Sequence, residues 1–100
     1  MKRIILLAFL CTTTLVMAQR INHVQEAIAN YDYEAALTLI AKEKPTIPLL
    51  LQKGKAQRGL GMNTEALSTY QEIITNDTAN TRAYIEAAEC CRSLAKYQQA

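Results

Sequence analysis

The feature that most constrains this chain is an internal repeat with a period of 34 residues. The stretch from Leu50 to Ala66 reads LLQKGKAQRGLGMNTEA, and its small and apolar positions recur 34 residues later. The matching pairs are Leu50 and Tyr84, Leu51 and Ile85, Gly54 and Ala88, Leu60 and Leu94, Gly61 and Ala95, Glu65 and Gln99, and Ala66 and Ala100. A period of this size is typical of an array in which each repeat is one supersecondary unit. We therefore predict a scaffold of stacked helical units.

The first 18 residues have the pattern of a secretory signal peptide. They open with the basic sequence MKR, continue with an apolar core at residues 4–10 and end at the small residue Ala18. The rival interpretation is an uncleaved membrane anchor, but a threonine run at residues 12–14 interrupts the apolar stretch, and a span needs about 20 predominantly apolar residues. Cys11 leaves lipid modification open as a third alternative. We expect an exported protein, periplasmic or associated with the cell envelope, cleaved near Ala18.

Without this segment the chain is electrically neutral. The whole chain has 11 Lys and Arg residues against 9 Asp and Glu residues, and Lys2 and Arg3 supply the entire excess. Nucleic-acid binding requires a basic face that releases counterions from the phosphate backbone. We therefore expect no nucleic-acid partner, and contact with a membrane only through the signal segment if it stays uncleaved.

The cysteine and histidine pattern gives no metal or redox motif. Cys90 and Cys91 are adjacent, and neighbouring side chains on a helix point about 100° apart, so the two thiols cannot bridge without distortion. There is no CxxC spacing, and His23 is the only histidine. We interpret Cys90 and Cys91 as small apolar residues of a packed helix, with oxidation against another chain left open, and we expect no metal site.

No motif predicts an enzyme. Gly54-Lys55 is not a phosphate-binding loop, because no Gly stands five residues before Gly54 and Ala56 replaces the Ser or Thr that should follow the lysine. The glycines around Leu60 lack the strand and third Gly of a dinucleotide fingerprint. His23 has no recognisable nucleophile and carboxylate partners. We predict no catalytic residues, no cofactor and no small-molecule substrate.

Helical periodicity and turn residues divide the segment after the signal peptide into helices, and no run alternates with the period of a strand. We expect helices over residues 20–29, 33–43, 48–60, 63–76 and 81–94, a turn at 95–97 and a sixth helix that starts at 98. Asn63 or Thr64 is predicted to cap the fourth helix and Thr81 the fifth. The expected inward-facing residues are Ile21, Val24, Ala27, Ile28, Ala36, Leu37, Leu39, Ile40, Ala66, Leu67, Tyr70, Ile73 and Ile74, and the fifth helix is expected to run through Tyr84, Ile85, Ala88 and Cys91.

The order of small and large residues resembles the tetratricopeptide repeat family. The residues that carry the resemblance are Leu50, Gly54, Gly61, Ala66, Tyr70 and Ile73, followed by Tyr84, Ala88, Cys91, Tyr97 and Ala100 in the next repeat. The sequence departs from the family pattern at Lys53, Gln57 and Thr78, where the family usually has Leu, Tyr and Pro. The resemblance implies an all-α fold over residues 19–100, with tandem antiparallel helix pairs stacked as an α-solenoid in a right-handed superhelix.

In that fold the repeat units would cover about residues 20–46, 47–80 and 81–100, the last of them incomplete. The first unit is four residues shorter than the period. A sixth helix that starts at residue 98 would leave the fifth helix uncovered, and repeat arrays close with a capping helix. We therefore expect further repeats or another domain after Ala100.

The resemblance also implies a concave surface lined by the first helix of each pair. The outward positions there are the candidate partner-binding residues Leu51, Gln52, Lys55, Arg58, Arg82, Ile85, Glu89 and Arg92. Their basic members could pair with a peptide carboxylate, and Leu51 and Ile85 add apolar contact. The family members that bind chaperone tails use a clamp that this chain keeps only at Arg82, and Glu86 would repel a carboxylate there.

The expected function is a protein-interaction scaffold or adaptor of the bacterial cell envelope that binds a peptide or protein on the concave face. The alternative is a docking module of a larger enzyme or of an envelope assembly or transport component, whose active domain would follow residue 100. A third class is self-assembly through uncapped helix ends. In addition, Asp77-Thr78-Ala79 resembles the O-glycosylation acceptor of secreted proteins in some bacteria, which leaves modification of Thr78 open.

Overall fold

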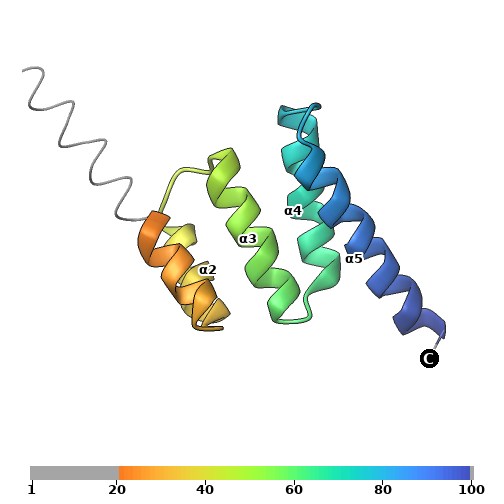
Figure 1. The fold of residues 1–100 in the computed structure, drawn as a ribbon, viewed down its shortest axis with the longest axis horizontal. Helices are drawn as coiled ribbons and strands as arrows, with labels where there is room; N and C mark the ends of the chain where they lie inside the picture. The colour runs from red at the N-terminus through yellow and green to blue at the C-terminus, as the bar shows by residue number, and fades with distance from the viewer. Residues whose placement is uncertain (1–20, 100) are drawn as a thin grey trace, which may run out of the picture.

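The computed structural model describes residues 21–99, and this part of the chain is all-α with no strand. A helical segment at residues 21–29 is followed by α2 (Tyr33–Ala41), α3 (Ile47–Gly59), α4 (Asn63–Asn76) and α5 (Thr81–Gln99). From α2 onward each helix packs against the next in sequence, and Figure 1 shows that successive helices reverse direction. The all-α prediction is confirmed. The predicted signal peptide and Cys11 lie outside the described residues.

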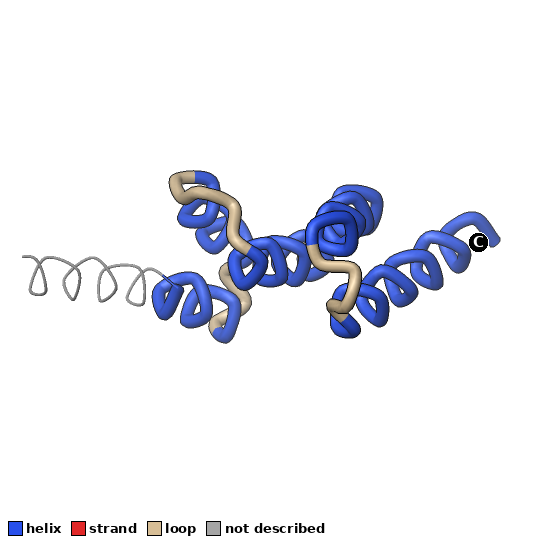
Figure 2. The backbone as a smooth tube through the Cα atoms, turned by 90° about the horizontal axis from the view of Figure 1, so that it is seen from above, coloured by secondary structure: helices blue, strands red, loops and turns tan. Residues whose placement is uncertain are grey.

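The helices form two rows. Figure 2 shows α2 and α4 on one side of the molecule, while the 21–29 segment, α3 and α5 lie toward the other side. Within residues 21–99 no helix is long and apolar enough to cross a bilayer. The row that contains α3 and α5 is the one that presents the predicted partner-binding residues.

Side chains that precede the first helical residue cap three of the helices. Thr46 Oγ1 accepts a hydrogen bond from the Leu49 amide at 3.4 Å, Asp32 Oδ1 from the Ala35 amide at 3.3 Å, and Asn80 Oδ1 from the Ala83 amide at 3.1 Å. A cap must stand just before the helix so that its oxygen reaches an amide of the first turn, whose partner is otherwise missing.

The predicted caps of α4 and α5 are therefore wrong. Asn63 and Thr64 are already helical, and Met62 occupies the N-cap position of α4 without a side-chain hydrogen bond. Thr81 is the first residue of α5, so the residue before it, Asn80, makes the capping bond instead. In both places the N-cap position precedes the residues that were predicted to cap the helix.

Two turns end their helices in the same way. After α3, Gly61 adopts φ +76°, its amide donates to Arg58 O, and the Met62 amide donates to Gln57 O at 2.8 Å. After the 21–29 segment, Tyr31 adopts φ 61°, and the Asp32 amide donates to Ala27 O at 2.8 Å. These are Schellman turns, in which a left-handed residue lets the chain satisfy the last carbonyls of the helix.

The predicted turn at residues 95–97 and the sixth helix are wrong, because α5 runs without a break to Gln99. The position equivalent to Gly61 in the repeat is Ala95. Glycine adopts the left-handed conformation without a steric penalty, whereas alanine is the strongest helix former. Ala95 matches the repeat because its side chain is small, but its backbone preference favours continuation of the helix.

The core consists of two clusters that meet at α3. The first joins the 21–29 segment, α2 and α3, and the second joins α3, α4 and α5. Their buried members are Val24, Ile28, Ala36, Ile40, Leu49 and Ala56 in the first, and Leu50, Ala66, Tyr70, Ile73, Ala83 and Cys90 in the second. Helix α3 thus contributes to both clusters, through adjacent residues such as Leu49 and Leu50. The predicted inward faces of the 21–29 segment, α2 and α4 are confirmed as buried or partly buried.

The apolar residues of α5 that match the repeat lie on an exposed face. Tyr84 is 48% exposed and Ile85 57% exposed, and Ala88 and Cys91 are exposed as well. The face that packs against α4 instead carries Ala83, Cys90 and, partly buried, Ala87. Consequently, of the two adjacent cysteines, Cys90 is a core residue and Cys91 a surface residue.

A buried hydrogen bond joins α3 to α4. Thr69 Oγ1 donates a hydrogen bond to Gln57 Oε1 at 2.7 Å, and both residues are buried. A buried polar group must find a partner to offset the loss of its hydration. Gln57 can therefore occupy a core position because α4 supplies a hydroxyl opposite it.

Candidate partner-binding groove

A groove of about 340 Å³ lies between α3 and α5, with Tyr70 of α4 at its lining. We call it the α3–α5 groove, and its lining residues are Pro48, Leu51, Gln52, Lys55, Arg58, Tyr70, Arg82 and Glu86. Helical spacing brings these side chains together. Leu51, Lys55 and Arg58 are four and three residues apart on α3, and Arg82 and Glu86 are four apart on α5, so each set shares one helix face.

An ion pair crosses the groove from one helix to the other. Arg58 Nη1 on α3 donates a hydrogen bond to Glu86 Oε2 on α5. The side chains of Arg58 and Glu86 are 30% and 25% exposed. Burial disfavours the charged guanidinium, but the hydrogen bond and the negative charge of Glu86 outweigh it, so the pKa of Arg58 is raised above its ordinary value. Arg58 therefore stays protonated at neutral pH.

Two further cations line the groove. Lys55 and Arg82 are exposed, and neither forms an ion pair with any residue that the structure describes. With Glu86 balancing Arg58, the groove carries an excess of positive charge from these two side chains. Burial, followed by the charge of Glu86, raises the pKa of Tyr70, so its phenol stays protonated at neutral pH. The arrangement suits a ligand with negative charge and hydrogen-bonding groups.

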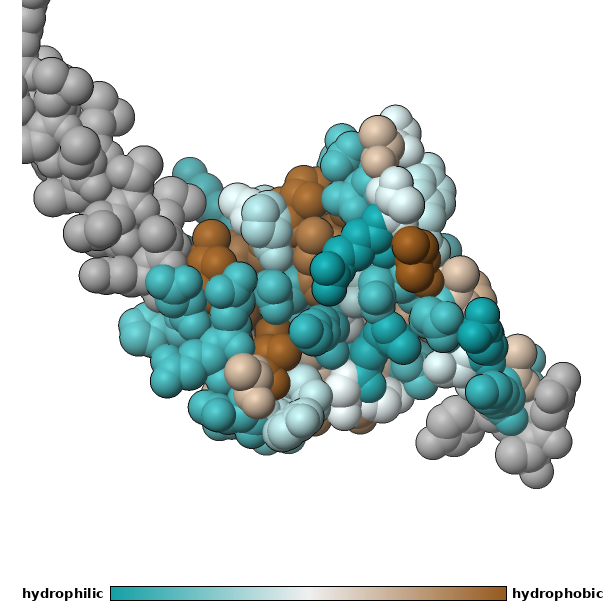
Figure 3. All heavy atoms as spheres, viewed as in Figure 1, coloured by the Kyte–Doolittle hydropathy of each residue, from teal (hydrophilic) through white to brown (hydrophobic). Residues whose placement is uncertain are grey.

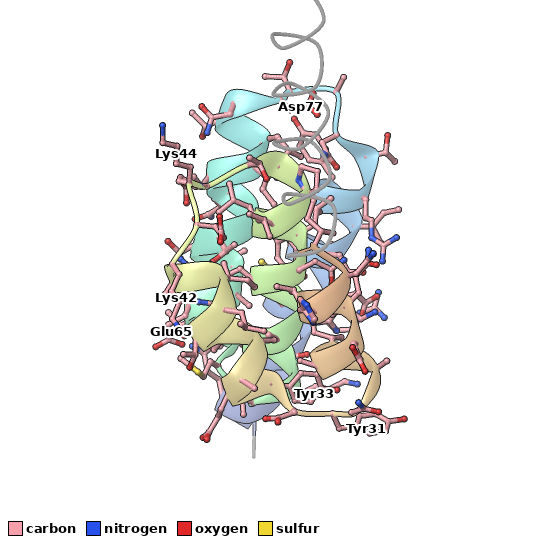
Figure 4. The ribbon with its side chains drawn as sticks, turned by 90° about the vertical axis from the view of Figure 1, so that its left-hand side faces the viewer. Tyr31, Tyr33, Lys42, Lys44, Glu65 and Asp77 are labelled. Atoms are coloured by element: carbon pink, nitrogen blue, oxygen red, sulfur yellow. The ribbon has the colours of Figure 1, made fainter. Side chains whose placement is uncertain are left out.

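A second hollow adjoins the groove on the same row of helices. It has a volume of about 430 Å³ and shares Gln52 and Lys55 with the α3–α5 groove. Its other side includes Tyr31 and Tyr33, whose rings meet edge to face with centroids 6.3 Å apart. Figure 4 shows these tyrosines together at one end of the helices, with Asp77 at the other end. Together the two hollows extend from the 21–29 segment across α3 to α5.

The surface around the groove is mostly hydrophilic. Figure 3, seen from the side of Figure 1, shows polar side chains over most of this face, with separate hydrophobic patches between them. Among the described residues, no group of three or more His, Cys, Asp or Glu could hold a metal ion. The groove therefore offers charge, hydrogen bonds and limited apolar contact.

Five of the eight predicted site residues line the groove: Leu51, Gln52, Lys55, Arg58 and Arg82. Ile85, Glu89 and Arg92 do not. Ile85 is exposed to solvent, and Arg92 Nη1 lies 3.3 Å from Glu89 Oε1, one turn away on α5 itself. None of these three residues lines the groove.

Three lining residues were not among the predicted site residues. Tyr70 was assigned to the core, and it is 1% exposed, but its ring still lines the groove. Pro48 was assigned only to the start of a helix. Glu86 was expected to repel a carboxylate, and the structure shows that Arg58 neutralises it. The opposite charges at these two positions, in equivalent helices of the repeat, were the sequence signal for this pairing.

Comparisons of the chain with protein-family models, with curated proteins and with solved structures find no match.

Proposed function

We propose that this chain is a protein-interaction scaffold of the tetratricopeptide type, and that the α3–α5 groove binds an extended peptide segment of a partner protein. In this proposal the helix pairs stack as a solenoid and the protein has no chemistry of its own. The proposal includes export through the N-terminal segment, so the partner would be a protein of the cell envelope.

The close contact of α3 with α4 supports the repeat assignment. A Cβ atom at Gly54 would lie 2.7 Å from Cε1 and 2.8 Å from the hydroxyl oxygen of Tyr70. Only a residue without a side chain allows Tyr70 to pack this closely on α3. The resemblance assigned Gly54 the same role, as a small residue where two helices of a unit approach each other.

The observation that carries the proposed function is the groove itself. Residues from two helices that are equivalent in the repeat face each other across it, and they include three cations and hydrogen-bonding side chains. An extended peptide exposes backbone amides and carbonyls along its whole length, and side chains such as Gln52 can bond to them. The adjoining hollow next to Tyr31 and Tyr33 extends the surface along which such a segment could lie.

The test is selection of peptides from a random library on the immobilised protein. Enriched peptides should lose binding to the Lys55→Glu and Arg82→Glu variants, which reverse charge on the two sides of the groove. They should keep binding to Lys96→Glu, which makes the same charge change in the last turn of α5, outside the groove. A library that yields no enriched peptide, or peptides that bind all these variants equally, would contradict the proposal.

A further inference from the structure

The ion pair between Arg58 and Glu86 joins parts of the chain that are 28 residues apart. It differs in kind from the pair between Arg92 and Glu89, which is three residues apart on one helix and more exposed. The Arg58 pair lies in the groove, with less than a third of either side chain exposed. A carboxylate is thus already bound to the most buried cation of the α3–α5 groove.

This contact has the chemistry that an acidic ligand would offer. A guanidinium presents five N–H donors in a planar fork and binds carboxylates with charge-assisted hydrogen bonds. Glu86 accepts from Nη1 of Arg58, while Lys55 and Arg82 beside it have no ion-pair partner within residues 21–99. Three cations and one internal carboxylate therefore line the same groove.

We propose that Glu86 occupies the place of a ligand carboxylate in the free protein, and that the ligand is a peptide segment with acidic side chains that displaces Glu86 from Arg58. This inference rests on the proposed function of the groove. At Arg58 the exchange replaces one carboxylate with another, so the change in free energy there is small. The net gain comes from a further ligand carboxylate at Lys55, which has no ion-pair partner within residues 21–99.

The displaced Glu86 would not be left without a cation. Arg82 stands four residues before it on α5, which places the two side chains on the same helix face. A neutral peptide cannot replace Glu86, because it would leave the half-buried guanidinium without a counter-charge. Glu86 is therefore a specificity-determining residue that discriminates against neutral segments and lowers the affinity for weakly acidic ones.

The alternative is that Glu86 only fastens α5 to α3. The two roles give opposite results for Glu86→Gln, tested with a fluorescein-labelled oligoglutamate peptide and its oligoglutamine analogue by fluorescence anisotropy. As an internal competitor, Glu86 should weaken oligoglutamate binding, so its replacement by Gln should strengthen it by about tenfold, the value of one charge-assisted hydrogen bond. The oligoglutamine peptide should show no such gain.

Glu89→Gln is the matched control, since it removes the same charge from the same helix at a position outside the groove. It should change oligoglutamate binding by less than about threefold, because exposed charges are well screened. Arg58→Gln introduced together with Glu86→Gln should remove the gain. Melting curves of all variants show whether each is folded, and Glu86→Asp, which keeps the charge but shortens the reach to Arg58, replaces Glu86→Gln if the latter unfolds. Glu86→Asp should then strengthen oligoglutamate binding relative to the wild type, by less than tenfold.

The outcomes separate this inference from the proposed function. If the wild type binds oligoglutamate and Glu86→Gln binds it equally or more weakly, the competitor role is wrong and the groove still binds peptides. If no variant binds oligoglutamate but the library yields groove-dependent peptides, the acidic ligand is wrong and the scaffold function stands. If neither experiment finds a peptide, both are overturned.

Discussion

Helices α3 and α5 are equivalent in the 34-residue repeat, yet they are buried differently. One face of each helix is buried to a similar extent. Leu49 and Ala56 of α3 correspond to Ala83 and Cys90 of α5, and all four are buried against the preceding helix of the chain. The adjacent face is covered by another helix in α3 but not, within residues 21–99, in α5. Its residues in α3 are covered by α4, whereas in the described part of the chain no helix packs on the corresponding face of α5.

The residues of that second face make the difference concrete. In α3 they are Leu50, Gly54 and Gln57, all buried. Their equivalents in α5 are Tyr84, Ala88 and Cys91, all exposed. The comparison teaches that a repeat in sequence predicts which residues share a face, while burial depends on whether another helix lies against it. The same substitution should therefore have large effects in α3 and small ones in α5.

The largest contrast is expected for leucine at the paired positions Gly54 and Ala88. Gly54→Leu places a branched side chain where Tyr70 already lies within 2.8 Å of a Cβ position, so we expect a loss of about 3 kcal/mol in the free energy of unfolding. Ala88→Leu adds the same atoms on an exposed helix face and should change it by less than about 0.5 kcal/mol. Urea denaturation followed by circular dichroism measures both. Equal losses would show that the repeat alignment is wrong at its centre.

A smaller contrast is expected when apolar groups are removed from the same face. Leu50 is 5% exposed in the second core cluster, so Leu50→Ala should lower the free energy of unfolding by about 2–3 kcal/mol, from lost burial and the cavity that remains. Tyr84 is 48% exposed, and Tyr84→Ala should lower it by less than about 1 kcal/mol. Thermal melts of the two variants, run beside the wild type, test the difference. A Tyr84 variant as unstable as the Leu50 variant would mean that the outer face of α5 is covered in solution.

The smallest contrast concerns the two thiols of α5 and involves no change in stability. Cys91 is exposed and should react with iodoacetamide in the folded protein. Cys90 is fully buried, and burial raises the pKa of its thiol, so it should stay protonated and unmodified. Mass spectrometry of the tryptic peptide over residues 83–92 should show one adduct, which Cys91→Ala removes and Cys90→Ala keeps. Two adducts in the native protein would show that α5 separates from α4.

The helix boundaries show which helix ends can be predicted from the local sequence and which cannot. Pro45 and Gly61 mark breaks that the structure contains, because one cannot continue a helix and the other readily adopts the left-handed turn. The turn expected at Ala95 failed, because the repeat supplied a matching size but not a matching backbone preference. Tyr31 shows the converse: it is not a glycine, yet it adopts φ 61° where the chain turns into α2.

The candidate site likewise contains residues that helical spacing predicts and excludes others that spacing alone could not exclude. The helical spacing of Leu51, Lys55 and Arg58 sufficed to place them together on one surface, and they line the groove. The spacing along α5 did not distinguish Arg82, which faces α3, from Arg92, which pairs with Glu89. That distinction depends on how α5 is rotated about its axis, and the buried residues Ala83 and Cys90 set this rotation.

The sequence by itself determined the all-α character, most of the helix breaks and the faces that the 21–29 segment, α2 and α4 bury, because these follow from local backbone preferences and helical periodicity. Only the tertiary structure decided that Gln57 bonds to Thr69, that Arg58 is held by Glu86, and that one face of α5 stays exposed. Each of these depends on which helix lies opposite a given side chain and at what rotation. That placement is set by the packing of whole helices, which no short stretch of sequence encodes.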